Sequence, residues 1–126
     1  MKNLMAHYLL KNGGNMAKLI SINEVKKIRK NSRNQKIGLC HGAFDVLHNG
    51  HLRHFQESRK QVDILIVSVT ADKFIFKGPS QPYNNEINRT KFLLHINSID
   101  YVYLDNNLTA EMYMLVCTAS FLEIAI

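Results

Sequence analysis

Two short runs of consecutive apolar residues constrain the fold of this chain more than any other feature. One run is Ile37 to Cys40, and the other is Ile64 to Val67. Such runs are typical of strands covered on both faces, which occur mainly in parallel sheets with helices on each side. Helical patterns alternate with them, so the sequence predicts an α/β fold. The expected elements are strands at 37–41, 63–69 and 100–104, helices at 50–60 and 85–97, and a Gly/Pro loop at 77–84.

A helix at about 22–33 is predicted from the residues at its start. Ser21 and Glu24 have the spacing of a capping box, and Ile20 and Val25 are placed as a hydrophobic staple. Residues 1–19 show no convincing periodicity, so we expect an N-terminal extension that is mobile or packs at the periphery. The predicted organisation is this extension followed by one folded domain at 20–126.

The composition is that of an ordinary globular protein. Hydrophobic residues make up 46% and charged residues 21% of the 126 residues, which argues against intrinsic disorder. No apolar run approaches the length of a membrane span, and the first 20 residues make a poor signal peptide. Cys40 and Cys117 are too few for a disulfide framework, so we expect both to be reduced in a cytoplasmic protein with no membrane partner.

The net charge of +6 fits an enzyme for anionic nucleotides or a nucleic-acid binder. Much of this charge lies between residues 26 and 36, where basic residues also fit one solvated face of a helix. We interpret them in that way and expect no nucleic-acid partner. The basic residues of this segment are Lys26, Lys27, Arg29, Lys30, Arg33 and Lys36.

The segment from Gly42 to His51 directly follows the first apolar run. His48 and His51 stand three residues apart around Gly50, and the next apolar residues keep helical spacing. A helix that opens after a strand and a glycine turn points unpaired backbone N–H groups at an anion, and Gly50 lets that anion approach the main chain. The two histidines are placed to flank the same phosphate group.

Histidines at this spacing can also belong to a helix face or to a metal site. In the metal alternative, His48, His51 and His54, with His41, would make the protein a hydrolase or a metal-binding module. This alternative is disfavoured because positions 48, 51 and 54 drift around a helix, and no Glu stands beside them as a general base. We therefore interpret His41, His54 and His95 as structural.

The segment Gly-Ala-Phe-Asp-Val-Leu-His-Asn-Gly-His resembles the GxFDxxHxGH signature of the HxGH nucleotidylyltransferases. This family includes glycerol-3-phosphate cytidylyltransferase and the adenylyltransferase half of ADP-heptose synthase. Residues 63–73 resemble its second strand and following turn, 77–82 its substrate loop, and 85–89 the start of its next helix. The resemblance covers roughly residues 36–113. It implies a Rossmann-like parallel sheet, here C-terminally shortened, in a cytidylyltransferase-like nucleotide-binding domain at 20–126.

The resemblance implies that an oxygen of a substrate phosphate attacks the α-phosphorus of a nucleoside triphosphate and releases pyrophosphate. Positioning and charge stabilisation supply most of the catalysis in such transfers. Mg²⁺ is the implied cofactor, held mostly by phosphate oxygens and water because no carboxylate cluster is visible. The nucleotide, CTP or ATP, is expected at Gly42, Ala43, Phe44, Asp45 and Gly50.

The catalytic and acceptor residues are implied by the same resemblance. His48 and His51 are expected to donate hydrogen bonds to the triphosphate, and Lys77 to neutralise the incoming substrate phosphate. Lys73 is a second candidate for that phosphate. Arg89 takes the position of the family's helix arginine, which can bind a phosphate in a bidentate way. The expected acceptor is a small phosphorylated sugar or polyol.

Most of these residues follow the end of a predicted strand. Ala43 and Asp45 follow the first, Lys73 and Lys77 the second, and Asp105 the third. In an open α/β sheet, ligands bind in the crevice at the carboxyl ends of the strands, near a topological switch point. The sequence therefore predicts that these residues converge on one crevice.

Three departures from the family pattern weigh against an efficient enzyme. Ala43 stands where many cytidylyltransferases have a hydroxyl residue, and Gln81 stands where heptose-type relatives carry Arg before Pro. The family's later Arg-Thr-x-Gly-Ile-Ser-Thr-Thr segment has no counterpart before Ile126, and residues 114–126 resemble neither it nor the strand ahead of it. A non-catalytic nucleotide-binding relative is therefore the alternative. Relatives of this fold commonly dimerise, so a homodimer is expected.

Overall fold

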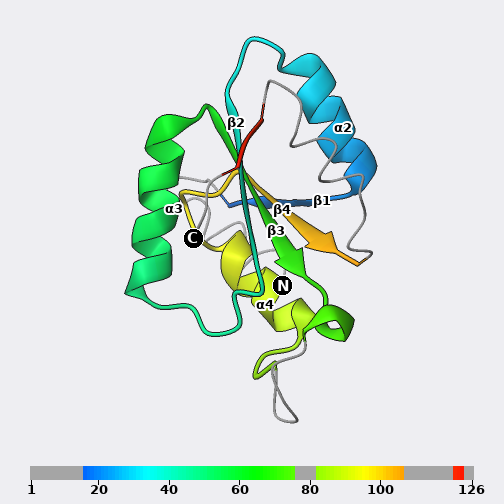
Figure 1. Cartoon of the computed structure of the whole chain (residues 1–126), viewed down its shortest axis with the longest axis vertical. Coiled ribbons are helices and arrows are strands. Elements are labelled where there is room, and N and C mark those ends of the chain that lie inside the picture. Colours follow the sequence, from blue (N-terminus) through cyan, green and yellow to red (C-terminus); the bar gives the residue numbers. More distant parts are fainter. Residues whose placement is uncertain (1–15, 76–81, 107–120, 124–126) are drawn as a thin grey trace, which may run out of the picture.

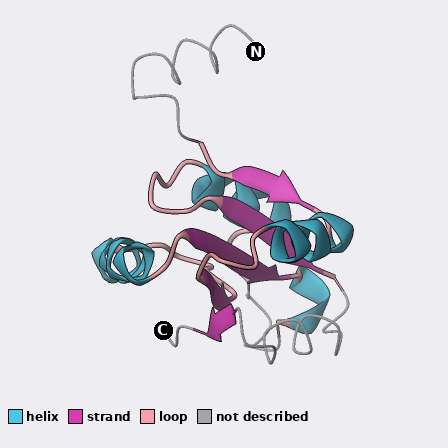
Figure 2. Ribbon diagram, turned by 90° about the horizontal axis from the view of Figure 1, so that it is seen from above, coloured by secondary structure: helices cyan, strands magenta, loops and turns pink. Residues whose placement is uncertain are grey.

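A parallel sheet with helices on both faces forms the centre of the molecule (Figures 1 and 2). The computed structural model describes residues 16–75, 82–106 and 121–123. Within them the sheet has five strands in the order β1-β4-β3-β2-β5, and every pairing is parallel. The predicted α/β fold with a Rossmann-like parallel sheet is confirmed.

The element boundaries agree with the sequence prediction to within a few residues. The 22–33 helix ends earlier than expected, at Asn31, and the 85–97 helix ends at Leu94. The strands are β1 (Lys18–Ile20), β2 (Ile37–Gly42), β3 (Ile64–Thr70), β4 (Tyr101–Asp105) and β5 (Phe121–Glu123). The helices are α2 (Ile22–Asn31), α3 (Asn49–Gln61) and α4 (Glu86–Leu94), with a short 3₁₀ helix, η1 (Asp72–Phe74).

Side chains alternate between the two faces of the sheet and form one apolar cluster on each. Cys40 and Val67 point to the face covered by α3 and α4, where they join Phe55 and Leu93. Leu39 and Ile66 point to the opposite face, covered by α2 through Val25. Burial on both faces explains why the strands have continuous apolar sequences. Figure 1 shows α2 and α3 on opposite sides of the sheet.

Residues 18 and 19, which were expected in the N-terminal extension, belong to the sheet. Lys18 lies opposite Tyr101 and Ile20 opposite Tyr103. Ala17 is buried, and its N–H donates to the carbonyl of Leu94 at 3.1 Å. A strand of three residues is too short to show a periodicity, so the sequence pattern did not reveal it. Residues 1–15 of the expected extension lie outside the described residues.

Residues 114–126 were interpreted as unlike the family's later strand, but Phe121–Glu123 within them forms the strand β5. Its backbone pairs with β2, with Phe121 opposite Ile37 and Glu123 opposite Leu39. The chain runs from β2 to β3 and β4 on one side of β2, and β5 lies on the other side. The strand order thus reverses beside β2, and this is the topological switch point where ligands of such sheets bind.

Candidate functional site

Phe44 fixes the turn that leads from β2 to the signature histidines. Its φ of 51° lies in the left-handed region, which is uncommon for a non-glycine residue. Its ring is buried and packs on Phe55, with 5.4 Å between ring centroids. A Cβ at Gly42 would lie 3.2 Å from Phe44 Cζ, so glycine leaves room for the ring. Aromatic burial offsets the strained backbone and aims the loop at the start of α3.

The two signature histidines form a reciprocal capping box at the start of α3. Nδ1 of His48 accepts a hydrogen bond from the N–H of Gly50 at 3.0 Å. The backbone N–H of His48 in turn donates to Nδ1 of His51 at 3.3 Å. Ser or Thr with Glu or Gln usually fill these two positions. Histidines can do the same with one ring nitrogen and keep the other nitrogen for a ligand.

This capping box determines the tautomer of both rings. A backbone N–H can only donate, so each Nδ1 must carry its lone pair, and in the neutral imidazole the proton is on Nε2. The ring centroids of His48 and His51 lie 4.1 Å apart, so the two Nε2–H groups belong to one small site. Together with the positive end of the α3 dipole they form a site suited to a phosphate.

Gly50 is required by the position of the His48 ring. A Cβ at Gly50 would lie 2.7 Å from Cε1 and 2.9 Å from Nδ1 of His48, which is closer than real Cβ atoms approach other groups. The glycine between the two histidines therefore makes the capping box possible. It also leaves the main chain open to a ligand.

The surroundings of His51 favour its neutral form. Burial lowers the pKa of His51, and positive charge on His48 and His54 lowers this pKa further. A neutral ring is also what the capping box needs, because a protonated Nδ1 could not accept from the backbone. The electrostatics and the hydrogen bonding therefore favour the same protonation state.

Asp45 joins the signature loop to the segment before α4. Its carboxylate accepts from the backbone N–H groups of Tyr83 and Asn84, at 2.7 Å each. The Asn84 side chain donates back to the carbonyl of Asp45 at 2.6 Å. An Asp at this position of the sequence could orient His48 or cap a turn. The described contacts fit a cap on a turn about forty residues away.

Arg89 is buried where the same loops meet. Its guanidinium donates to the carbonyls of Ala43 at 2.8 Å, Thr70 at 2.7 Å and Asn84 at 3.0 Å. It also forms an ion pair with Asp72. Its side chain is 0% exposed, so these contacts support a structural role in which Arg89 holds three loops together. The expected contact with a substrate phosphate stays a prediction.

Of the two lysines expected at the substrate phosphate, Lys73 lies within the described residues. Lys73 is exposed on η1, next to Asp72, with its Nζ 5.1 Å from the centroid of the Phe74 ring. Lys77 and Gln81 lie outside the described residues. The place of Lys73 after β3 fits an approach to the phosphate site from the β3 side.

Two of the loops that were predicted to converge, those after β2 and β3, meet at Arg89, and the convergence of the remaining site residues on one crevice stays a prediction. Ala43 follows β2 and Thr70 ends β3, and both carbonyls bind the same nitrogen of Arg89. Sequence reasoning missed Asn84 and Glu86 as partners in this arrangement. Glu86 Oε1 accepts from the N–H of Asp72 at 3.0 Å. No local pattern could reveal either contact, since each joins segments far apart in the sequence.

The metal alternative lacks a ligand set. Among the described residues, no group of three or more His, Cys, Asp or Glu side chains could hold a metal ion. His54 instead points to the core, with Nε2 at 3.7 Å from Sγ of Cys40. Burial raises the pKa of the Cys40 thiol, against a smaller opposing effect of Ser58, as for a structural cysteine.

In the described segments no helix is long and apolar enough to cross a membrane.

The fold and the histidine site define a nucleotidyltransferase-like domain. The chain belongs to the cytidylyltransferase-like family, whose model matches residues 39–119. That range contains the signature loop, the described part of the Arg89 network and both candidate lysines. The resemblance to this family drawn from the sequence is confirmed.

Individual relatives agree with the family match. The bifunctional protein HldE of Aliarcobacter butzleri (strain RM4018) is 36% identical over 85 residues, which is 64% of this chain and 18% of the relative. HldE of Desulfatibacillum aliphaticivorans is 38% identical over 90 residues, or 68% of this chain and 18% of the relative. The chain thus spans about a fifth of the length of these relatives.

A solved structure supports the fold. The lipopolysaccharide core biosynthesis protein from Thermoplasma volcanium GSS1 superposes with a TM-score of 0.57 and 25% sequence identity. The match covers 64% of this chain and 66% of that chain. It extends the similarity from sequence to three-dimensional arrangement.

Proposed function

We propose that this chain transfers a nucleoside monophosphate from CTP or ATP to a small sugar phosphate or polyol phosphate, with release of pyrophosphate. The observation that carries the proposal is the histidine capping box, which leaves both Nε2–H groups free of the helix cap. The family match and the similarity to HldE support this reaction class. A slight preference for CTP is part of the proposal.

In the proposed step, an oxygen of the acceptor phosphate forms a bond to the α-phosphorus, and the bond from that phosphorus to the bridging oxygen of pyrophosphate breaks. Negative charge grows on the oxygens around the α-phosphorus and on the leaving group. The Nε2–H groups of His48 and His51 donate to these oxygens, and donors placed in advance where charge develops lower the barrier. No proton needs to leave either ring.

Cations supply the remaining charge compensation in this proposal. Lys73 and Lys77 neutralise the acceptor phosphate as it approaches the anionic nucleotide. Arg89 either reaches the same phosphate or acts only through the loops that it joins. The contacts of its buried guanidinium support the second role.

Mg²⁺ fits the site as a cofactor carried by the nucleotide. The nearest described carboxylates are already engaged, Asp45 by two backbone N–H groups and Asp72 by Arg89. Phosphate oxygens and water would therefore supply most ligands, as is usual for this ion. When bound, Mg²⁺ would offset the charge of the pyrophosphate leaving group.

The reaction is tested by pyrophosphate release from CTP or ATP in the presence of Mg²⁺ and a panel of sugar phosphates and polyol phosphates. Release that depends on the acceptor and is lost in His48→Ala would support the proposal. His95→Ala, at the exposed C-cap of α4, is the matched control and should retain release. Nucleotide binding without release for any acceptor would contradict transfer and support the non-catalytic alternative.

We also propose that the chain forms a homodimer. Among the described residues β1 pairs on one side only, with β4, and such edges favour association. Light scattering should give about twice the chain mass of 14.5 kDa. A monomer mass at micromolar concentration would contradict the dimer.

A further inference from the structure

Large apolar side chains are exposed around Asp45 of the signature loop. Val46 follows Asp45 directly, Tyr83 donates to it from the backbone, and Ile87 stands four residues after Tyr83 in the first turn of α4. These three are half of the six large apolar side chains that are exposed among the described residues. Apolar groups that gather at a surface mark binding sites, whereas single ones need no explanation. Tyr83 is the most exposed of them, at 76%.

The backbone of Tyr83 is fixed, while its side chain is not. The N–H of Tyr83 donates to one carboxylate oxygen of Asp45, and the N–H of Asn84 donates to the other. The Asn84 side chain closes the arrangement by donating to the carbonyl of Asp45. No hydrogen bond or ring contact with another described residue holds the phenol ring. The fold therefore sets the place of this side chain and leaves its ring available to a ligand.

Hydrogen bonds connect Tyr83 to both parts of the proposed phosphate site. Three residues lead from Asp45 to His48, and a chain of that length spans at most about 10 Å. On the other side, Glu86 accepts from the N–H of Asp72 in η1, the short helix of the candidate lysine. Figure 1 shows the signature loop and the segment leading into α4 at the same end of the molecule, beyond the carboxyl ends of β2 and β3. A ligand whose phosphate lies at the histidines can thus extend toward Tyr83.

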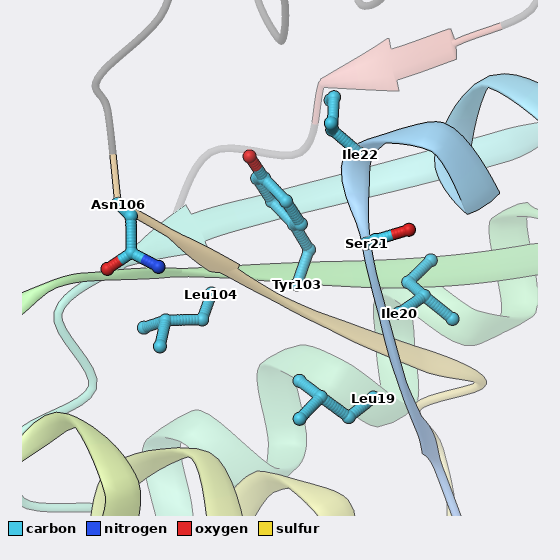
Figure 3. A pocket seen from close by; sticks show the side chains of 7 residues that line it. All are labelled: Leu19, Ile20, Ser21, Ile22, Tyr103, Leu104 and Asn106. Carbon is cyan, nitrogen blue, oxygen red and sulfur yellow. The ribbon is translucent and has the colours of Figure 1, made fainter.

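The cavity shown in Figure 3 is a poorer candidate for the acceptor. It has a volume of about 400 Å³ and is lined by residues of β1, of the start of α2 and of the segment 103–106. None of these residues belongs to the signature loop, to η1 or to the segment before α4. The exposed ring beside Asp45 is therefore the better place to look for an acceptor contact.

We propose that the ring of Tyr83 packs against the sugar ring of the acceptor and selects cyclic sugar phosphates over open-chain polyol phosphates. This inference rests on the proposed function, since it places the acceptor phosphate between the histidines and Lys73. A tyrosine ring has apolar faces and a polar tip, and a sugar ring has apolar C–H faces with hydroxyl groups at its edge. Glycerol 3-phosphate has no ring face to cover the phenol. Tyr83 is then a specificity-determining residue.

The test removes the ring and keeps the backbone contacts with Asp45. On the full chain, ligand-observed NMR titrations with glucose 1-phosphate, mannose 1-phosphate, glycerol 3-phosphate and CTP measure each affinity. In Tyr83→Ala we expect the better-bound hexose phosphate to bind about tenfold more weakly, because a single pocket contact changes affinity by that factor. Glycerol 3-phosphate and CTP should bind as before. Tyr83→Phe keeps the ring and should bind the hexose phosphate nearly as well as the unaltered chain.

A matched control and a fluorescent reporter sharpen the result. Phe92→Ala removes another aromatic side chain of α4 that is 51% exposed, and it should change no affinity. The chain has no tryptophan, so Tyr83→Trp introduces a single indole at the proposed contact. Its emission should change with the hexose phosphate and stay constant with inorganic phosphate. Far-UV circular dichroism checks that each variant is folded.

Four outcomes would overturn the inference. They are no binding of either hexose phosphate by the unaltered chain, equal binding by Tyr83→Ala, equal weakening of all ligands in Tyr83→Ala, and no change in the emission of Tyr83→Trp with the hexose phosphate. Equal weakening would show that the substitution acts through the loop and not through a ring contact. Because these titrations need no turnover, failure of the proposed reaction is recognised separately, by the pyrophosphate assay.

Discussion

In both His48 and His51 the two ring nitrogens have different roles, one in the helix cap and one in the proposed phosphate site. Nδ1 caps the helix and Nε2–H is not used by the cap, so the residue that fixes the start of α3 is also the proposed donor to phosphate. Asp at the same positions could cap the helix, but an ionised carboxylate has no donor to offer to a phosphate. The chemistry of the site thus depends on a nitrogen that the fold leaves unused.

This division of tasks predicts that cap and donor can be separated by substitution. In His48→Asn the side-chain oxygen can still accept from the N–H of Gly50, but no N–H replaces Nε2. We expect the free energy of unfolding to stay within about 0.5 kcal/mol, because Asn is a good N-cap. Turnover should fall on the order of 100-fold, the usual effect of removing one preorganised donor. Urea unfolding and pyrophosphate release measure the two quantities, and retained turnover would refute the donor role.

Gly50→Ala should change turnover much more than stability. Alanine favours the helix by about 1 kcal/mol over glycine. Its Cβ would however overlap the His48 ring, which can swing away because it is the end of a side chain. We therefore expect little change in stability and a clear loss of turnover. Thermal unfolding and the pyrophosphate assay test this, and full activity would show that the ring position is not needed.

The state of His51 predicts how activity depends on pH. Its pKa is lowered from the usual histidine value of about 6.5, so the folded chain keeps the ring neutral below the pH at which an unfolded chain protonates it. Protonation breaks the capping box. Stability should therefore be constant above about pH 6.5 and fall as the pH drops from there to the lowered pKa, while turnover should fall as the pH drops through the lowered pKa.

His51→Gln provides the control for this pH dependence. Glutamine at the third helical position can accept from the backbone of His48 but does not titrate near neutral pH. Urea unfolding between about pH 8 and about pH 5 should show a smaller loss of stability in this variant than in the unaltered chain. Identical pH dependence in both would mean that His51 does not carry the effect.

At the scale of elements, Arg89 connects three loops that follow or precede regular structure. Its four protein partners lie just after β2, at the last residue of β3, at the first residue of η1 and just before α4. A planar guanidinium can bind such spread acceptors in fixed directions, while the lysine ammonium cannot. The site geometry therefore depends on one buried side chain in α4.

Arg89→Lys should consequently destabilise the fold although the charge is retained. It leaves buried carbonyls and Asp72 without their partners, and breaking a buried ion pair costs about 3 kcal/mol or more. Urea unfolding measures the loss. Arg53→Lys, on the exposed face of α3, is the matched control and should change stability by less than about 0.5 kcal/mol. Equal stability of both variants would contradict the role of Arg89 in holding the three loops together.

At the scale of the whole molecule, local patterns predicted the α/β architecture and located the signature loop correctly. The apolar runs, the Ser21 capping box and the position of His48 to His51 are all local signals. The contacts of Arg89 and Asp45 join segments up to 46 residues apart, so no local pattern specifies them. β1 and β5 were missed for a related reason, since three-residue strands become strands only by pairing with β4 and β2.

The position of β1 predicts that the domain would be unstable without this strand. Two truncated chains, one beginning at Met16 and one at Ser21, differ only in residues 16–20. These residues bury Ile20 and Ala17 and donate from Lys18 N–H to the carbonyl of Asp100 at 3.0 Å. Burial of one isoleucine contributes about 2 kcal/mol, so the chain from Ser21 should unfold at clearly lower urea concentration. Comparing the two truncated chains with each other isolates β1 from whatever residues 1–15 contribute. Equal midpoints would show that β1 adds nothing to the stability of the fold.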